Sequence, residues 1–283
     1  MLSLGEINRF DDYRTSDLPY TCGHTIHSYA FWSDVIAEWS ELIPEIEVQH
    51  ALTDMRGYKT PGVSNSVQNY LSIVTNIMAP MDKFSRFQKF ICPELDKRRV
   101  YINKLYDAVR QISQTPILID SSKSAHRFRL LHSLRPNTSK AIFLTRDGRA
   151  IAASNLRKNV ATVPKSARKW WLANQFAISM MRTLPKSAYI HVRYEELCAN
   201  PEKTAMRICS YIDVSYEPEM LDFRSHEQHI IGGNRMRMEE KSQIHEDLRW
   251  MSTLKVSEIN EFERIAGRLN RKLLREFFRE ANV

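Results

Sequence analysis

The chain has 283 residues, of which 43% are hydrophobic and 26% are charged, a profile that indicates a globular protein and excludes a disordered chain. It contains no long uncharged apolar run of the length that a membrane-spanning helix needs. The formal net charge of +8 favours an anionic partner, such as nucleic acid, a phosphorylated cofactor or an acidic substrate, although a solvated basic surface explains it equally well.

Apolar residues recur at helical spacing over most of the chain, and three short apolar or β-branched runs interrupt this pattern. The pattern predicts helices over residues 31–42, 65–78 and 96–114, a strand over 116–120, a helix over 124–134, a strand over 141–145, helices over 149–159 and 166–184, a strand over 188–192, and helices over 201–211 and 256–278. Strands that alternate with helices predict an α/β fold, in which a mostly parallel sheet of buried strands is flanked by helices. We expect one helix-rich domain over residues 1–283.

The cysteines are scattered and form no CxxC pair, which is typical of a reduced intracellular protein. They are Cys22, Cys92, Cys198 and Cys209. The N-terminus has no basic segment followed by an apolar one, so we expect no signal peptide and a cytoplasmic location. A metal site is conceivable at Cys22, His24 and His27, but no fourth ligand is evident nearby and we expect no metal.

A lysine and several hydroxyls follow the first predicted strand, in the segment DSSKS at residues 120–124. Ligands of a parallel α/β sheet gather at the carboxyl ends of the strands, and a helix N-terminus there favours an anion. Lys123 is therefore a candidate binding residue. The alternative is that a serine caps the helix and Lys123 is solvated.

The second predicted strand ends in RDGR at residues 146–149. Arg146 can present its planar fork to a phosphate, and Ser154 falls about two turns into the following helix. Asp147 can cap that helix, and Gly148 permits close approach of the backbone. The turn predicts a phosphate clamp, although a structural salt bridge would explain Arg146 and Asp147 alone equally well.

A glycine-containing loop at residues 229–237 carries Arg235 and Arg237. Its two adjacent glycines, Gly232 and Gly233, indicate a special backbone geometry. The loop is either a flexible basic segment or a lid over an anion.

Together these segments resemble the sulfotransferases that use 3′-phosphoadenosine 5′-phosphosulfate (PAPS), in particular the bacterial type. The resemblance rests on LIDSSKSAHR, IFLTRDGRAIAASNLRK, HVRYEELCANP and HIIGGNRMR followed by EDLRW, over about residues 116–254. The Gly-Glu pair at 5–6, CG at 22–23 and FW at 31–32 also resemble the bacterial branch, and weakly the tyrosylprotein branch. The resemblance implies a P-loop-NTPase-like three-layer fold, PAPS as the sulfonate donor, a hydroxyl-bearing acceptor and no metal.

The resemblance also implies roles for single residues. Arg146 and Ser154 would bind the 3′-phosphate of the donor, and Arg235 and Arg237 fall in the loop that closes over it. It further implies a helical acceptor side at residues 30–114, a cofactor-binding core at 115–255 and a C-terminal helix at 256–283.

For catalysis, Lys123 matches the lysine near the transferring sulfonate, and Glu6 matches a proposed base for the acceptor hydroxyl. Sulfuryl transfer moves an anionic group from a phosphate to an oxygen nucleophile. By analogy with phosphoryl transfer, the protein positions the groups and supplies positive charge to the leaving oxygen. A lysine and a carboxylate fit these two tasks.

One family feature is not found. The glycine-rich loop of the type P-R-S-G-T-[ST], which cradles the 5′-phosphosulfate and precedes the Gly-Glu segment, does not occur in this sequence. We therefore expect a domain without its first strand and phosphate loop, weak or no catalysis, and an exposed sheet edge or groove. Either Met1 is a misassigned start or the chain is a derivative that kept only the 3′-phosphate half of the site.

Two other functions compete with a sulfotransferase. The first is a non-catalytic binder of nucleic acid or acidic polysaccharide, whose affinity would fall steeply with salt; the chain has no nucleic-acid motif, so nucleic acid is not an expected partner. The second, a nucleotide kinase, needs a GxxxxGK[ST] loop, which the sequence lacks. The acceptor and the oligomeric state cannot be inferred from the sequence.

Overall fold

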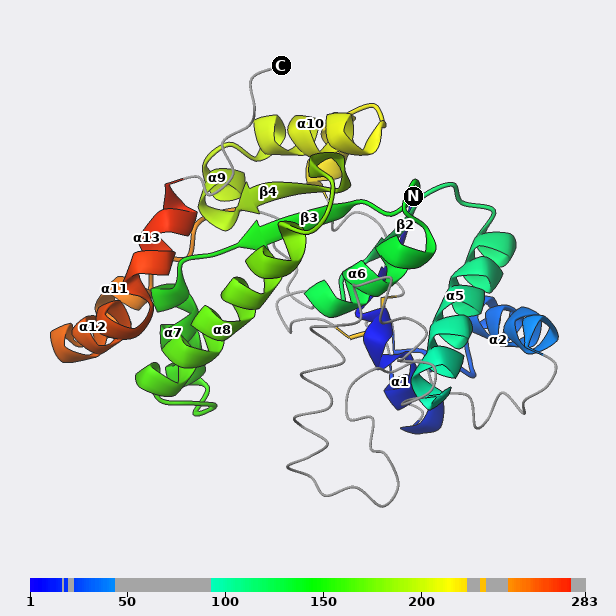
Figure 1. Ribbon diagram of the computed structural model, residues 1–283, viewed down its shortest axis with the longest axis horizontal. Helices are drawn as coiled ribbons and strands as arrows, with labels where there is room; N and C mark the ends of the chain where they lie inside the picture. The colour runs from blue at the N-terminus through cyan, green and yellow to red at the C-terminus, as the bar shows by residue number, and fades with distance from the viewer. Residues whose placement is uncertain (17, 20–22, 44–92, 223–229, 233–243, 276–283) are drawn as a thin grey trace. The chain divides into compact units, whose positions relative to one another are not determined.

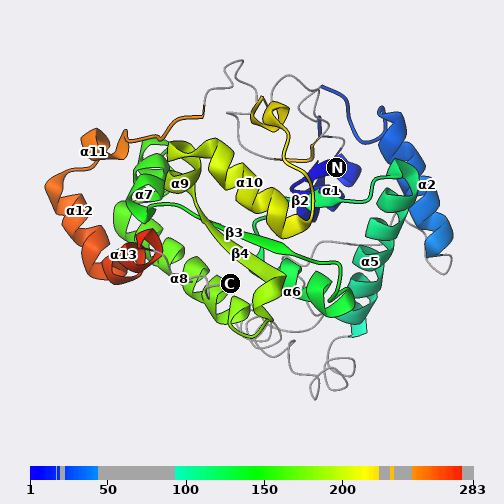
Figure 2. The ribbon, with the colours of Figure 1, turned by 90° about the horizontal axis from the view of Figure 1, so that it is seen from above.

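The computed structural model describes residues 1–16, 18–19, 23–43, 93–222, 230–232 and 244–275 (Figures 1 and 2). The chain divides into two compact units. Unit 1 comprises residues 1–137 and 226–240, and unit 2 comprises residues 138–225 and 241–283. The protein is a helix-rich α/β protein, and the described part of each unit holds a two-stranded parallel sheet.

Unit 1 is built around a short strand at the N-terminus. Its main elements are β1 (Leu2–Gly5), α1 (Phe10–Ser16), α2 (Ala30–Leu42), α5 (Pro93–Ser113), β2 (Leu118–Asp120) and α6 (Ala125–Leu134). β1 runs parallel to β2, with Leu2 opposite Leu118. On its other side, Gly5 forms a parallel bridge with Ile231, and the Glu6 amide donates to the Ile231 carbonyl oxygen at 2.6 Å. β1 therefore has partners on both edges.

The core of unit 1 lies between α1, α2 and α5. Figures 1 and 2 show α2 and α5 side by side. Phe10, Trp32 and Trp39 are fully buried between these helices, and the ring of Phe10 meets that of Trp39 edge-on. The indole N–H of Trp39 donates to the Tyr101 carbonyl oxygen at 3.1 Å, so the buried donor is satisfied.

Unit 2 carries the second sheet. Its main elements are β3 (Ala141–Thr145), α7 (Gly148–Arg157), α8 (Val163–Met181), β4 (Tyr189–Arg193), α9 (Tyr194–Ala199), α10 (Pro201–Ile212), α11 (Trp250–Thr253), α12 (Val256–Phe262) and α13 (Arg268–Leu274). β3 and β4 pair in parallel register from Ala141 opposite Tyr189 to Thr145 opposite Arg193. Figure 1 shows α7 and α8 on one side of this pair and α9 and α10 on the other. The small residues of α7 let it pack closely against α8, with Ala152 and Ala153 fully buried.

The strands are less buried than the sequence predicts. Ile142 and Leu144 of β3 are 45% and 54% exposed, and Ile119 of β2 is 42% exposed. The prediction of buried strands is wrong for these positions, because each described sheet has only two strands and leaves apolar side chains uncovered.

Most predicted helices and all three predicted strands are confirmed within a few residues. The helix predicted over residues 65–78 lies outside the described residues. The helix predicted over 149–159 ends earlier, at Arg157, because Asn159 adopts a left-handed conformation with φ 53°. The long C-terminal helix is interrupted by a π-helical turn, Glu263–Gly267, and β1 and α9 were not predicted.

Two minor predictions concern metal and membrane. His27 bonds through Nε2 to the Arg14 carbonyl oxygen at 2.9 Å, while Cys22 lies outside the described residues. Cys198 and Cys209 are free thiols. Within the ranges that the structure describes, none of the helices combines the length and apolarity that crossing a bilayer requires.

His191 gives unit 2 a pH dependence. Its ring Nε2 lies 2.8 Å from the Thr145 hydroxyl, and burial, with the charges of Arg193 and Arg207, lowers the pKa of His191 to about 4. The unfolded chain then binds a proton near pH 6.5 that the folded chain does not bind until about pH 4. The contribution of His191 to the free energy of unfolding is therefore fully present above about pH 6.5 and is lost as the pH falls towards 4. After allowance for solvent screening, this loss is about 1–2 kcal/mol.

We expect the variant His191→Gln to flatten this slope in chemical denaturation curves recorded between pH 4 and pH 7. The matched control is His24→Gln, because the His24 side chain is exposed to solvent, unlike that of His191. A slope that His191→Gln leaves unchanged would contradict the assignment.

Candidate functional site

The first group of predicted site residues lies at the end of β2 in unit 1. Asp120 receives hydrogen bonds on both carboxylate oxygens: Tyr106 and Arg127 donate to Oδ2 at 2.5 and 3.0 Å, and the Ser122 amide donates to Oδ1 at 2.8 Å. Burial and the adjacent carboxylate raise the pKa of Tyr106, so its hydroxyl stays a donor. Asp120 thus fixes the backbone that leads into Lys123.

Lys123 and Glu6, which are far apart in the sequence, are in contact. The Lys123 ammonium donates to Glu6 Oε1 at 2.6 Å. The Lys123 side chain is 70% exposed and that of Glu6 is 19% exposed. Lys123 adopts a left-handed conformation with φ 55°, which is strained for a non-glycine residue and common at functional positions. The structure brings this predicted pair together.

The segment before the predicted basic loop packs beside Glu6. The Gly232 amide donates to the Tyr13 hydroxyl oxygen at 3.1 Å, and a side chain at Gly232 would lie 3.0 Å from the Glu6 Cβ. Arg235 and Arg237 lie outside the described residues.

Ser124 caps α6, because its hydroxyl accepts a hydrogen bond from the Arg127 amide at 3.2 Å. The capping alternative is therefore correct for this serine. One amide of the first turn of α6, that of Arg127, therefore already has a hydrogen-bond acceptor within the protein.

The second group lies in unit 2, where β3 ends in the turn 146–149. Asp147 caps α7 as predicted: its carboxylate accepts from the Arg149 amide at 2.9 Å and from the Arg149 guanidinium at 2.6 Å. The Asp147 amide in turn donates to Glu195 Oε1 at 2.8 Å. These bonds hold the turn in one conformation.

Gly148 is required by packing. A side chain there would lie 2.8 Å from Cδ2 of Trp170 and closer still to the ring of Phe262. The close approach predicted for this glycine is real, but it is made by two buried aromatic side chains. The missing side chain therefore lets α7 begin at Gly148, three residues after β3 ends at Thr145.

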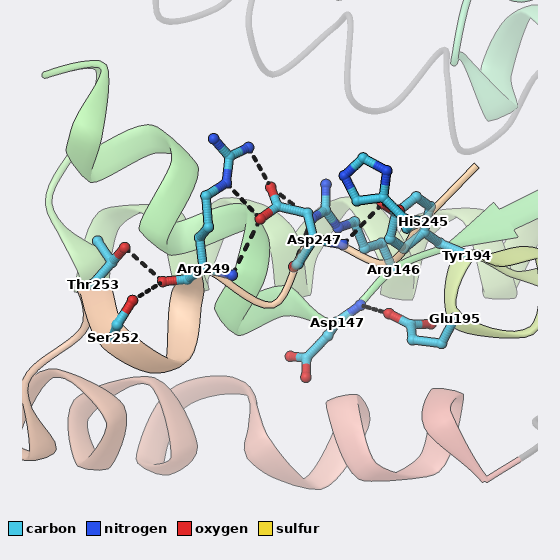
Figure 3. A network of polar contacts seen from close by, with 9 residues as sticks. All are labelled: Arg146, Asp147, Tyr194, Glu195, His245, Asp247, Arg249, Ser252 and Thr253. Carbon is cyan, nitrogen blue, oxygen red and sulfur yellow. Dashed lines mark hydrogen bonds and ion pairs between the residues drawn. The ribbon is translucent and has the colours of Figure 1, made fainter. Parts of the chain in front are cut away.

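Arg146 projects into a polar network that Figure 3 shows. Its guanidinium carbon lies 4.4 Å from the ring centre of Tyr194, and Nη2 lies 3.5 Å from Asp247 Oδ2. Its Nε is buried and has no hydrogen-bond partner among the described residues. A buried guanidinium N–H without an acceptor is costly, and this donor of Arg146 has unused hydrogen-bonding capacity.

The Asp247 carboxylate places a negative charge beside Arg146. Arg249 holds its carboxylate with both Nε and Nη2, at 2.7 and 2.8 Å. The hydrogen bonds from Arg249 and the nearby Arg146 charge keep the pKa of Asp247 well below its usual range. The Tyr194 hydroxyl anchors this segment, since it donates to the His245 carbonyl oxygen at 3.2 Å and accepts from the Asp247 amide at 3.3 Å (Figure 3).

Ser154 lies in α7, half-buried, seven residues after the capping Asp147. Seven residues are close to two helical turns, so Ser154 lies above the cap on the same face of the helix. The predicted arginine and serine are thus carried by one strand–helix turn.

Chemically, the end of β3 in unit 2 carries groups of the kind that bind anions. It combines a fixed arginine with an unsatisfied buried N–H and a hydroxyl on the following helix. Within the described ranges, no group of three histidine, cysteine, aspartate or glutamate residues could hold a metal ion.

Asp247 and the anchoring role of Tyr194 were not predicted from the sequence. Asp247 lies 101 residues after Arg146, and no local pattern links the two. The one local indication in the sequence is the charged segment EDLRW, in which Asp247 lies.

Comparison with known proteins gives one family and two similar structures. A family model described as "Sulfotransferase family" matches residues 37–218, more than half of the chain. The Sulfotransferase Domain from the Curacin Biosynthetic Pathway is 18% identical, with a TM-score of 0.42, over 69% of this chain and 77% of that one. The Sulfotransferase Domain from the Synechococcus PCC 7002 Olefin Synthase is 15% identical, with a TM-score of 0.40, over 93% of each chain. No curated protein matches this chain.

Proposed function

The chain belongs to the sulfotransferase family, and from this we propose that it binds PAPS and transfers the sulfonate to a hydroxyl-bearing acceptor. The observation that carries the proposal is the buried, unpartnered Nε of Arg146 at the end of β3. A phosphate oxygen is the acceptor that such a guanidinium group binds best.

On this proposal, Arg146 and Ser154 hold the 3′-phosphate of the donor. Arg146 contributes a full charge and a planar fork, and the Ser154 hydroxyl contributes one hydrogen bond. The Arg146 guanidinium is already oriented by the Tyr194 ring, 4.4 Å away, so little side-chain freedom is lost on binding. From the family resemblance we also propose Arg235 and Arg237 as residues that bind the donor.

PAPS supplies an activated sulfonate when it is bound, and Lys123 and Glu6 would serve the transfer. The Lys123 ammonium stabilises negative charge that develops on the leaving oxygen. The Glu6 carboxylate accepts the proton of the acceptor hydroxyl. Their 2.6 Å contact supports a shared site, because each side chain orients the other before substrate arrives. From the family membership we also propose that the chain adopts a P-loop-NTPase-like three-layer fold.

The direct test is calorimetric titration with adenosine 3′,5′-bisphosphate, the product that remains when PAPS has lost its sulfonate. We expect saturable binding at one site per chain and a rise in melting temperature with ligand concentration. No binding at millimolar concentration, together with salt-sensitive binding of heparin, would overturn the proposal in favour of a polyanion-binding protein.

Replacing Asp247 by asparagine is expected to strengthen bisphosphate binding. The carboxylate lies 3.5 Å from Arg146 and would repel an incoming phosphate, so its removal should raise affinity about three- to tenfold. Titrations of Asp247→Asn and wild-type protein at two salt concentrations check this.

The control is Asp213→Asn, since the exposed Asp213 side chain pairs with Lys140 at 2.6 Å and is not one of the residues of the network that Figure 3 draws. Weaker binding by Asp247→Asn would mean that the carboxylate orients Arg146 more than it competes with the ligand.

A further inference from the structure

We propose that Asn270 is a positioning residue for the anion-binding turn that carries Arg146; this inference rests on the function proposed above. Asn270 lies in α13, well beyond residue 218, where the family match ends. It is 1% exposed, and its helix neighbours Leu269 and Leu273 belong to the apolar core of unit 2. A polar residue at such a position needs partners for both ends of its amide.

Both partners are in the turn at residues 146–149. The Gly148 amide donates to Asn270 Oδ1 at 2.8 Å, and Asn270 Nδ2 donates to Asp147 Oδ1 at 3.0 Å. The side-chain amide therefore bonds to the two residues that directly follow Arg146. The opposite orientation of the amide would place donor against donor at Gly148, so the network fixes the orientation shown.

These two bonds control where Arg146 points. The Asp147 oxygen that Asn270 binds also caps α7 by accepting from the Arg149 amide at 2.9 Å. Loss of the Asn270 amide would leave Gly148 and Asp147 each short of a buried partner, and the turn would relax. Arg146 is the first residue of this turn, so a relaxed turn would let its guanidinium leave its position over the Tyr194 ring.

Packing alone does not explain Asn270. Leucine has the same branching and the same number of side-chain heavy atoms, and it would suit the apolar character of a core formed by Phe262, Leu269 and Leu273. The amide is useful only because of its bonds to the turn. A helix in the C-terminal part of the chain thereby sets the geometry of a binding residue more than a hundred positions earlier.

The first arm of the test needs no ligand. Hydrogen exchange is measured on peptides that contain the Gly148 amide, in the wild-type protein, in Asn270→Leu and in the packing control Leu273→Ala. We expect Asn270→Leu to speed exchange of that amide about tenfold relative to the rest of α7, because its acceptor is gone. Leu273→Ala should lower the melting temperature without this local change. Equal exchange in the two variants would overturn the proposal.

The second arm measures affinity for adenosine 3′,5′-bisphosphate, with Asn270→Asp in case the leucine variant does not fold. The variant N270D keeps an acceptor for Gly148 but turns a carboxylate towards Asp147. We expect about tenfold weaker binding than wild type at pH 8, and a ratio that recovers as the pH falls towards 5, when the carboxylate pair takes up a proton. Leu273→Ala should bind as wild type does.

The two arms separate the possible failures. If the wild-type protein does not bind the bisphosphate, the proposed function fails and the exchange arm still decides whether Asn270 orders the turn. Wild-type affinity in Asn270→Asp at pH 8 would overturn the positioning role while leaving the proposed function intact.

Discussion

Replacing Arg146 by alanine is expected to weaken binding of adenosine 3′,5′-bisphosphate about 100-fold. A charge-assisted, two-pronged contact with phosphate contributes about 3 kcal/mol, and each 1.4 kcal/mol is about tenfold in affinity. Alanine also leaves the Asp247 carboxylate paired with Arg249 alone, since it removes the Arg146 Nη2 that lies 3.5 Å from that carboxylate. Calorimetric titration at a temperature where both proteins are folded measures the loss.

Two further variants sharpen this prediction. Arg146→Lys keeps the charge and loses the planar fork, so we expect about a tenfold loss. Arg168→Ala removes an exposed arginine from α8 and should change affinity less than twofold. If Arg168→Ala weakened binding as much as Arg146→Ala, the affinity would come from the overall basic charge and not from a specific clamp.

Replacing Gly5 by alanine is expected to destabilise unit 1 by about 3–4 kcal/mol. Gly5 has a left-handed backbone with φ 69°, and an added Cβ would meet the carbonyl oxygen of Ile231 and lie 2.7 Å from its amide nitrogen. Backbone cannot move aside as a flexible side chain can, so the bridge to Ile231 would open. Its hydrogen bonds, from Glu6 to Ile231 at 2.6 Å and from Ile231 to Leu4 at 3.2 Å, would be lost.

The control is Gly23→Ala, followed by denaturant unfolding. Gly23 also has a left-handed backbone, with φ 84°, but an added Cβ there meets nothing within 4 Å. Its cost should be about 1 kcal/mol, from backbone strain alone. Equal costs for the two variants would show that the contact between β1 and Ile231 contributes nothing to stability.

The parts of the fold that depend on neighbouring residues could be predicted from the sequence. Asp147 was expected to cap the helix that begins at Gly148, and it does, because a cap bonds to an amide two residues away. The helices with a clear apolar face were found for the same reason. The strand Leu2–Gly5 was missed because it has only four residues, although Leu2 and Leu4 alternate with polar positions as in a strand.

The contacts between distant segments could not be predicted. Nothing in the sequence links Asn270 to Gly148, or Asp247 to Arg146, because each pair is joined only by the folded chain. The sequence contains one indication that Asn270 is buried, because it shares a helix face with the apolar residues Ala266 and Leu273. The exposure of Ile142 and Leu144 also depends on how many strands a sheet has, which their own sequence does not specify.

The central claim is that Arg146 holds the 3′-phosphate of an adenine nucleotide. It is tested most directly by a cycle of four titrations, in which wild-type protein and Arg146→Ala each bind adenosine 3′,5′-bisphosphate and adenosine 5′-monophosphate. If the claim is right, removing the 3′-phosphate from the ligand weakens binding to the wild-type protein about 100-fold and has little further effect on Arg146→Ala. If the two losses instead add fully, Arg146 does not contact that phosphate and the claim is wrong.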